Sequence, residues 1–190
     1  MIYSLQYLYK GDNLMQNNRT YDMVQIAIFA GLLAICSWIT VPMTIPFTMQ
    51  TFAFFLMMLV LGGKKGLAAL GVYDLIGAIG LPVFSGFRGG IGVFFGNTGG
   101  FLIGFILSGL LFWAIDYLTK EKPTARVVSA VLSMAIYFFV GTVWFAMLTT
   151  GKITSESLFS AFTVCTLPFI LPDILKLLLA ITISKRLKSH

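Results

Sequence analysis

Apolar residues run along this chain in long blocks that are separated by short polar or glycine-rich segments. Each block approaches the ~20 residues with which a helix crosses ~30 Å of hydrocarbon. The blocks predict membrane-spanning segments at about residues 23–41, 48–61, 66–81, 99–118, 126–149 and 158–184. Pro168 and Pro172 fall in the last block, so we expect it to begin with a loop or half-helix before the final helix.

The composition places these segments in a bilayer rather than in a water-soluble core. Hydrophobic residues make up 58% of the chain and charged residues 11%, whereas a soluble domain has about 25% charged residues. A transmembrane β-barrel needs alternating polar and apolar positions, but stretches such as 103–107 are apolar on every side. We therefore expect an all-α integral membrane protein, a bundle of six transmembrane helices.

Polar and charged residues dominate the first part of the chain. Residues 1–22 predict a polar N-terminal tail ahead of a single transmembrane domain at 23–190, with Met15 as an alternative start. The tail does not read as a signal peptide, because no apolar core precedes a small-residue cleavage site.

The positive charges are distributed unevenly between the two ends of the predicted bundle. Ten of the thirteen Lys and Arg residues lie in the N-terminal tail, at 62–65, at 119–126 and in the C-terminal tail. Since cytoplasmic loops carry the excess of Lys and Arg, we expect both termini in the cytoplasm and segments 42–47 and 82–98 outside. The net charge of +6 then reflects topology, and nucleic-acid binding is not expected.

Few residues in the predicted spans are suited to catalysis. Cys36 and Cys165 lie in apolar segments and are interpreted as small core residues, and His190 is the only histidine. Neither a Ser–His pair nor a His-containing metal site can be assembled within the spans. We therefore expect no enzyme activity, no metal and no cofactor.

Asp173, Lys176 and Asp74 are ionisable residues within predicted spans, where charges are costly and usually functional. Asp173 and Lys176 are three residues apart and share one helix face. They either form a structural ion pair or contact a ligand. Asp74 either pairs with a neighbouring helix or borders a cavity.

The segment from Ser85 to Gly92 is rich in glycine, which lets backbone approach a ligand closely. Arg88 lies at its centre, where it would suit a ligand carboxylate by bidentate hydrogen bonds or reach lipid headgroups. A different pattern occurs in the first span, where small residues four apart allow close helix contact. This stripe serves either internal packing or partner docking, and consists of Ala27, Ala30, Gly31 and Ala34.

The stretch GLPVFSGFRGGIGVFFGNTGGFLIGF at 80–105 resembles the signature region of the BioY family, the biotin-specific S components of energy-coupling-factor (ECF) transporters. PFTMQTFAF at 46–54 and LPDILKLLLA at 171–180 are similar to further segments of that family. The resemblance covers the chain from about residue 22 to its end. It departs from many relatives at Asn97, where they have proline, and at Asp74, where an aliphatic residue is expected.

The resemblance implies a six-helix subunit that binds biotin near its outer face in the bacterial plasma membrane. It implies as partners a transmembrane coupling subunit and two cytoplasmic ATPase subunits, with docking through the small-residue stripe. Asp173 and Lys176 suit the ureido ring of biotin, and Arg88 suits its carboxylate. The remaining candidate site residues are Gln50, Tyr73, Phe84, Phe87, Gly89, Gly90 and Asn97.

Three alternatives stay open at this point. The first keeps the class but changes the vitamin to thiamine, riboflavin or another small solute. The others are a membrane channel and an intramembrane enzyme, although the polar groups gather at the outer end instead of lining several helices. Competition binding separates the vitamins, and flux without a coupling subunit or ATP would indicate a channel.

Overall fold

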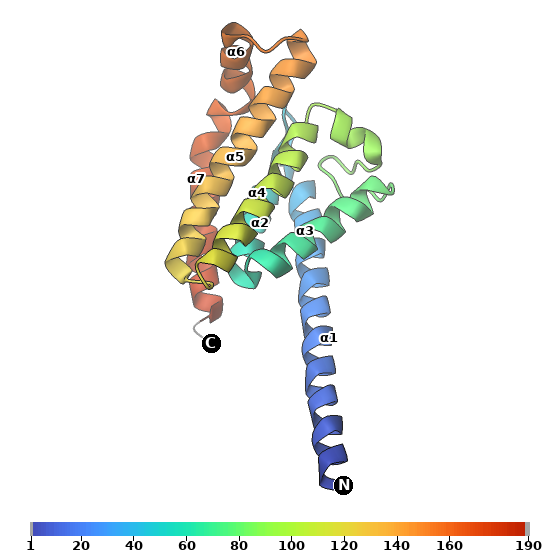
Figure 1. Ribbon diagram of the computed structural model, residues 1–190. Helices are drawn as coiled ribbons and strands as arrows, with labels where there is room; N and C mark the ends of the chain where they lie inside the picture. Colours follow the sequence, from blue (N-terminus) through green and yellow to red (C-terminus); the bar gives the residue numbers. More distant parts are fainter. Residues whose placement is uncertain (1, 189–190) are drawn as a thin grey trace.

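The computed structural model describes residues 2–188, with side chains from 19 to 187, and it is mostly helical (Figure 1). Two short strands, β1 (Thr40–Val41) and β2 (Phe47–Thr48), pair antiparallel around the Pro-containing connector. A 3-10 helix, η1 (Ile91–Phe95), lies within the glycine-rich segment. The α-helices are α1 (Ile2–Trp38), α2 (Gln50–Leu61), α3 (Gly63–Ala78), α4 (Gly99–Leu118), α5 (Pro123–Thr150), α6 (Ser155–Cys165) and α7 (Leu167–Lys188).

Among the described residues, four segments are long and apolar enough to cross a membrane, which supports the predicted class of helical membrane protein. They are Arg19–Trp38 in α1, Gly99–Leu118, Pro123–Thr150 and Leu167–Leu187. The α2 helix is apolar but shorter, and α3 has 16 residues. The predicted break in the last segment is also present, because α6 ends at Cys165 and α7 starts two residues later with Pro168 near its first turn. Proline is accommodated there since the first helical N–H groups have no partner within the helix.

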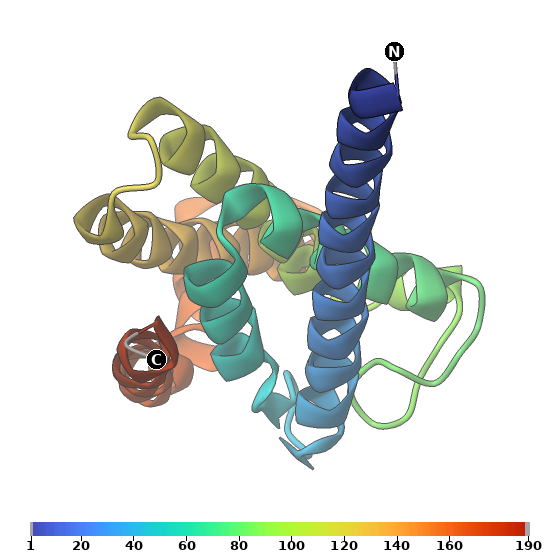
Figure 2. The same cartoon turned by 90° about the horizontal axis from the view of Figure 1, so that it is seen from below.

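The N-terminal residues continue the first span as one helix instead of forming a separate segment. Helix α1 begins at Ile2, and its first half projects beyond the other helices (Figures 1 and 2). Adding residues to an existing helix costs much less than nucleating one, so the polar sequence extends the helix that the apolar sequence forms. The division of the chain into a tail at 1–22 and a transmembrane domain at 23–190 stays a prediction.

Close packing of α4 on α5 depends on small residues that face each other. A Cβ on Gly104 would approach the Tyr137 Cα to 2.8 Å, so only glycine allows the two backbones to come this near. Ser108 Oγ donates to Ser133 O at 2.8 Å, and Ser133 Oγ donates back to Ser108 O at 3.2 Å. Helix α2 contacts α1, α3, α5 and α7 and buries nine of its residues, so it lies inside the bundle.

An ionic cluster fixes the end of the bundle where the α2–α3 corner meets the α4–α5 turn (Figure 1). Arg126 donates to both oxygens of Asp116, at 2.7 Å and 3.0 Å, and both side chains are buried. Asp116 Oδ2 also accepts from the Gly63 N–H at 2.8 Å. Arg126 further contacts Glu121 at 2.9 Å. Two turns that are distant in sequence are therefore held together by one carboxylate.

Asp74 lies in α3 with both carboxylate oxygens buried and without a hydrogen-bond partner among the described residues. It borders an apolar hollow between α3, η1 and α4. The sequence allows Asp74 either to pair with a neighbouring helix or to border a cavity. The structure places it at the edge of a cavity.

We expect Asp74→Leu to stabilise the protein by about 1–3 kcal/mol, because an unpaired buried polar group is replaced by an apolar one. The measurement is thermal unfolding of the purified protein in detergent. Asp116→Leu is the matched control and should lower stability, since that carboxylate is fully paired. A lower unfolding temperature for Asp74→Leu would show that its carboxyl has a partner.

Candidate ligand pocket

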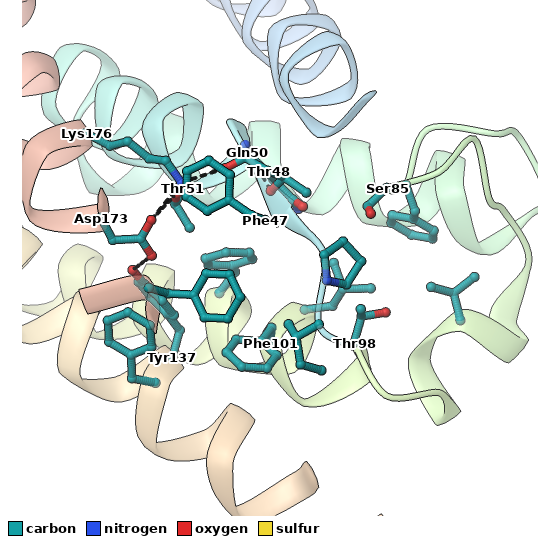
Figure 3. Close-up of a pocket in the computed structure, with 18 residues that line it drawn as sticks. Phe47, Thr48, Gln50, Thr51, Ser85, Thr98, Phe101, Tyr137, Asp173 and Lys176 are labelled. Carbon is teal, nitrogen blue, oxygen red and sulfur yellow. Dashed lines mark hydrogen bonds and ion pairs between the residues drawn. The ribbon is translucent and has the colours of Figure 1, made fainter. Parts of the chain in front are cut away.

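A pocket opens between β2, α2, the 82–98 segment, α4, α5 and α7 (Figure 3). It holds about 620 Å³ of space, its open mouth included, which is within the range of small-molecule sites. Its walls are largely aromatic, and Figure 3 shows polar groups at two opposite sides. The lining residues are Ile45, Pro46, Phe47, Thr48, Gln50, Thr51, Phe84, Ser85, Val93, Thr98, Phe101, Leu102, Phe105, Tyr137, Phe138, Phe169, Asp173 and Lys176.

One side of the pocket is organised around the carboxylate of Asp173. Its Oδ1 accepts from Thr51 Oγ1 at 2.9 Å and from Lys176 Nζ at 2.7 Å, and its Oδ2 accepts from the Tyr137 hydroxyl at 2.7 Å. These donors come from α2, α7 and α5. A buried charge is tolerated when it is paired and hydrogen-bonded, and this network meets both conditions.

Lys176 uses all three of its N–H groups within the protein. Besides Asp173, Nζ donates to the Thr48 carbonyl at 2.6 Å and to Thr51 Oγ1 at 3.0 Å. It also lies 3.9 Å from the centre of the Phe47 ring, a favourable cation–π position. The i, i+3 spacing of Asp173 and Lys176 thus places both ends of an ion pair on the face of α7 that meets α2 and β2.

Two buried polar atoms of the described lining residues have no partner. Gln50 Nε2 and Ser85 Oγ are both buried and make no hydrogen bond to any described residue. Buried polar groups are normally satisfied. A ligand in the pocket would supply the missing partners.

Comparison with known proteins assigns the chain to a family. A model of the BioY family matches residues 12–190. The chain is 36% identical over 170 residues to "Biotin transporter BioY" of Thermotoga maritima, which covers 88% of this chain and 95% of the relative. It is 35% identical to "Biotin transporter BioY2" of Lactococcus lactis, over 87% of this chain and 88% of the relative. The chain belongs to the BioY family.

The chain also shares its fold with a solved structure. A crystal structure of the S-component for biotin from an ECF-type ABC transporter superposes with a TM-score of 0.77, at 23% identity. The superposition covers 92% of this chain and 94% of the other.

Four of the residues predicted for the site line the BioY pocket, namely Gln50, Phe84, Asp173 and Lys176. Tyr73 lies behind the wall: its ring packs edge-on against Phe84 at 5.5 Å, and its hydroxyl donates to the Val83 carbonyl at 3.2 Å. It supports the lining without forming part of it.

Arg88 does not line the pocket, in contrast to its predicted place at a ligand carboxylate. Phe84 and Arg88 exchange backbone hydrogen bonds, at 2.9 Å and 3.3 Å, so the chain reverses between them. This turn leaves the Arg88 side chain exposed, with Nε donating to Ser85 O at 3.0 Å. Arg88 therefore lies on the outer side of Ser85, whose hydroxyl faces the pocket.

The other predicted loop residues also lie outside the lining, for separate reasons. Phe87 stacks on Trp38 with ring centres 5.2 Å apart. Gly89 passes against the backbone at Leu81, where a Cβ would come within 2.3 Å of the carbonyl oxygen. Gly90 donates to Gly77 O at 2.7 Å. Asn97 is exposed and precedes Thr98, which does line the pocket.

Sequence reasoning missed much of the lining, and Tyr137 and Thr51 are the most important omissions. Tyr137 is a tyrosine in the middle of a predicted span, which is a signal that its hydroxyl needs a partner. Thr51 follows Gln50 at the start of a span. The aromatic wall (Phe47, Phe101, Phe105, Phe138 and Phe169) carries no signal that separates it from ordinary core residues.

The small-residue stripe of α1 is divided between the inside and the outside of the molecule. Ala30 and Ala34 are buried in the core, whereas Ala27 and Gly31 are exposed. A Cβ on Gly31 would meet no atom within 4 Å. Ala30 and Ala34 therefore pack internally, and only Ala27 and Gly31 are available to a partner.

Proposed function

We propose that this chain binds biotin at the extracellular side of the cell membrane, as the substrate-specificity subunit of an ECF-type vitamin transporter. The observation that carries the proposal is the Asp173 network at one side of an aromatic pocket, in a chain of the BioY family. The chain is a transport subunit and not an enzyme.

The chemistry of the pocket fits the two halves of biotin. The ureido ring has two N–H donors and a carbonyl acceptor. Asp173 Oδ2 accepts one hydrogen bond from Tyr137, and an ionised carboxylate oxygen can accept another. It therefore suits a ureido N–H, and the unpaired Gln50 Nε2 suits the ureido carbonyl. The thiophane ring and alkyl chain then lie on the aromatic wall, which points the carboxylate toward Ser85.

In this proposal, side chains of α1 and α3 hold the cover of the pocket in place. Ser37 Oγ and Tyr73 donate to Val83 O, and Trp38 Nε1 donates to Pro82 O at 2.8 Å. These bonds hold the start of the 82–98 segment. Arg88 acts on the ligand carboxylate only from the rim, as a positive charge in solvent.

The proposed topology is a six-helix bundle in which α2 and the α3 helix also lie in the membrane and both termini are cytoplasmic. The α2–α3 corner, the α4–α5 turn and the end of α7 share one end of the molecule (Figure 1), and these segments carry most of the Lys and Arg residues. Partner subunits would be a transmembrane coupling protein and two cytoplasmic ATPases. The exposed positions Ala27 and Gly31 are proposed to contact the coupling subunit.

We expect Gly31→Phe to leave biotin binding intact and to reduce uptake about fivefold or more, because a bulky ring prevents close helix contact at an exposed position. The measurements are binding to the isolated chain and uptake by cells that express the complete transporter. Val131→Phe, at an exposed position of α5, is the control because it adds the same ring on a different helix. Normal uptake by Gly31→Phe would remove this face from the docking surface.

The proposal is tested by titration calorimetry of the purified chain in detergent with biotin, thiamine and riboflavin. We expect heat of binding with biotin only. Binding of thiamine or riboflavin in place of biotin would change the vitamin. No binding by a folded sample would refute the proposed function.

A further inference from the structure

The charges of the pocket bear on which forms of the ligand it accepts. Among the described lining residues, Asp173 and Lys176 are the charged ones, and they pair with each other at 2.7 Å. The lining therefore has no net charge. A ligand carboxylate therefore meets no unpaired positive charge among the described lining residues.

The ion pair itself cannot take a carboxylate without losing its own bonds. All three Nζ donors of Lys176 are used, by Asp173 Oδ1, Thr51 Oγ1 and Thr48 O. A carboxylate beside them would lie against the Asp173 anion, and like charges in a buried site repel strongly. The acidic group of the ligand must therefore lie at the opposite side.

That opposite side offers neutral hydroxyl groups. Ser85 and Thr98 come from the two ends of the loop that covers the pocket, and Figure 3 shows both away from Asp173 and Lys176. Ser85 Oγ is buried and has no partner. A hydroxyl both donates and accepts, so it can bind a carboxylate oxygen, an amide N–H or an amide carbonyl.

A cation beside Ser85 is Arg88, which is exposed and donates through Nε to the Ser85 carbonyl. Interactions of an exposed charge are weakened by water and salt. The negative charge of the ligand thus contributes little to binding.

From this arrangement we infer that the pocket also takes biotin amides, in which the carboxylate is replaced by an uncharged carboxamide, nearly as well as biotin. This inference rests on the proposed function and extends its substrate class. The recognised parts are the ureido ring and the apolar rings, and the end group needs only to hydrogen-bond with a hydroxyl.

The test is calorimetry of the full chain with biotin and with its primary amide in parallel. We expect dissociation constants within about fivefold of each other, less than about 1 kcal/mol. Biotin binding with an amide weaker by about fiftyfold or more would overturn this inference and leave the proposed function intact. Binding of neither ligand would refute the proposed function, and the inference with it.

Two variants test which residues bind the end group of the ligand. Ser85→Ala should weaken both ligands by a similar factor, about fivefold for one lost hydrogen bond, so the ratio of the two dissociation constants stays the same. Arg88→Gln should lower biotin affinity by less than about threefold. If Arg88→Gln weakened biotin more than about tenfold and the amide far less, Arg88 would hold the carboxylate directly and the inference would be wrong.

Discussion

Asp173→Asn is expected to weaken biotin binding by about tenfold or more, a loss of about 1.4 kcal/mol. Asparagine keeps the size of the side chain but turns one acceptor oxygen into a donor and removes the charge that balances Lys176. The ligand then loses its charged acceptor, and the Lys176 cation stays buried without its counterion. Titration calorimetry of wild type and variant measures the difference.

Tyr137→Phe is the matched control for this prediction. It removes one of the three hydrogen bonds to Asp173 but leaves the charge and the ion pair in place, so its effect should be smaller. Equal affinities of wild type and Asp173→Asn would remove Asp173 from the binding site. Unfolding temperatures of both variants show whether a change in binding reflects a change in folding.

Arg126→Leu is expected to lower the free energy of unfolding by about 3–5 kcal/mol, because it leaves the buried Asp116 carboxylate without its cation. Thermal unfolding in detergent measures the loss. The effect is on stability and not on the ligand, since neither residue lines the pocket.

Glu121→Gln tests the same cluster at its exposed partner. The Glu121 side chain is 74% exposed, and exposed ion pairs contribute about 1 kcal/mol or less. If Glu121→Gln destabilised the protein as much as Arg126→Leu, the charge of the whole cluster would matter rather than the buried pair. If Arg126→Leu had no effect, the buried ion pair would not contribute to stability.

The helices could be predicted from the sequence because their determinants are local. Uninterrupted apolar blocks mark α4 and α5 within a few residues of their observed ends, and the two prolines mark the break between α6 and α7. The extension of α1 to Ile2 could not be predicted in this way. A polar composition indicates that a segment is exposed to solvent, but a solvent-exposed helix and a solvent-exposed coil are both polar.

The candidate site could be predicted only where chemistry is unusual for its surroundings. Asp173 and Lys176 stand out because charge is rare inside a span. Arg88 was equally conspicuous, but its orientation depends on the backbone turn between Phe84 and Arg88, which the sequence does not determine. Likewise, Ala30 and Gly31 are adjacent in the stripe, and only the packing of α1 separates the buried residue from the exposed one.

The carboxylate of Asp173 joins parts of the chain that are made at very different times during synthesis. Its hydrogen bond to Thr51 spans 122 residues, and the bond from Lys176 to the Thr48 carbonyl spans 128. The ribosome must therefore deliver almost the whole protein before these contacts can form. Thr48 and Thr51 therefore lack these partners until α7 has been synthesised. A nascent chain stalled before α7 is thus expected to insert its earlier helices and yet have no affinity for ligand.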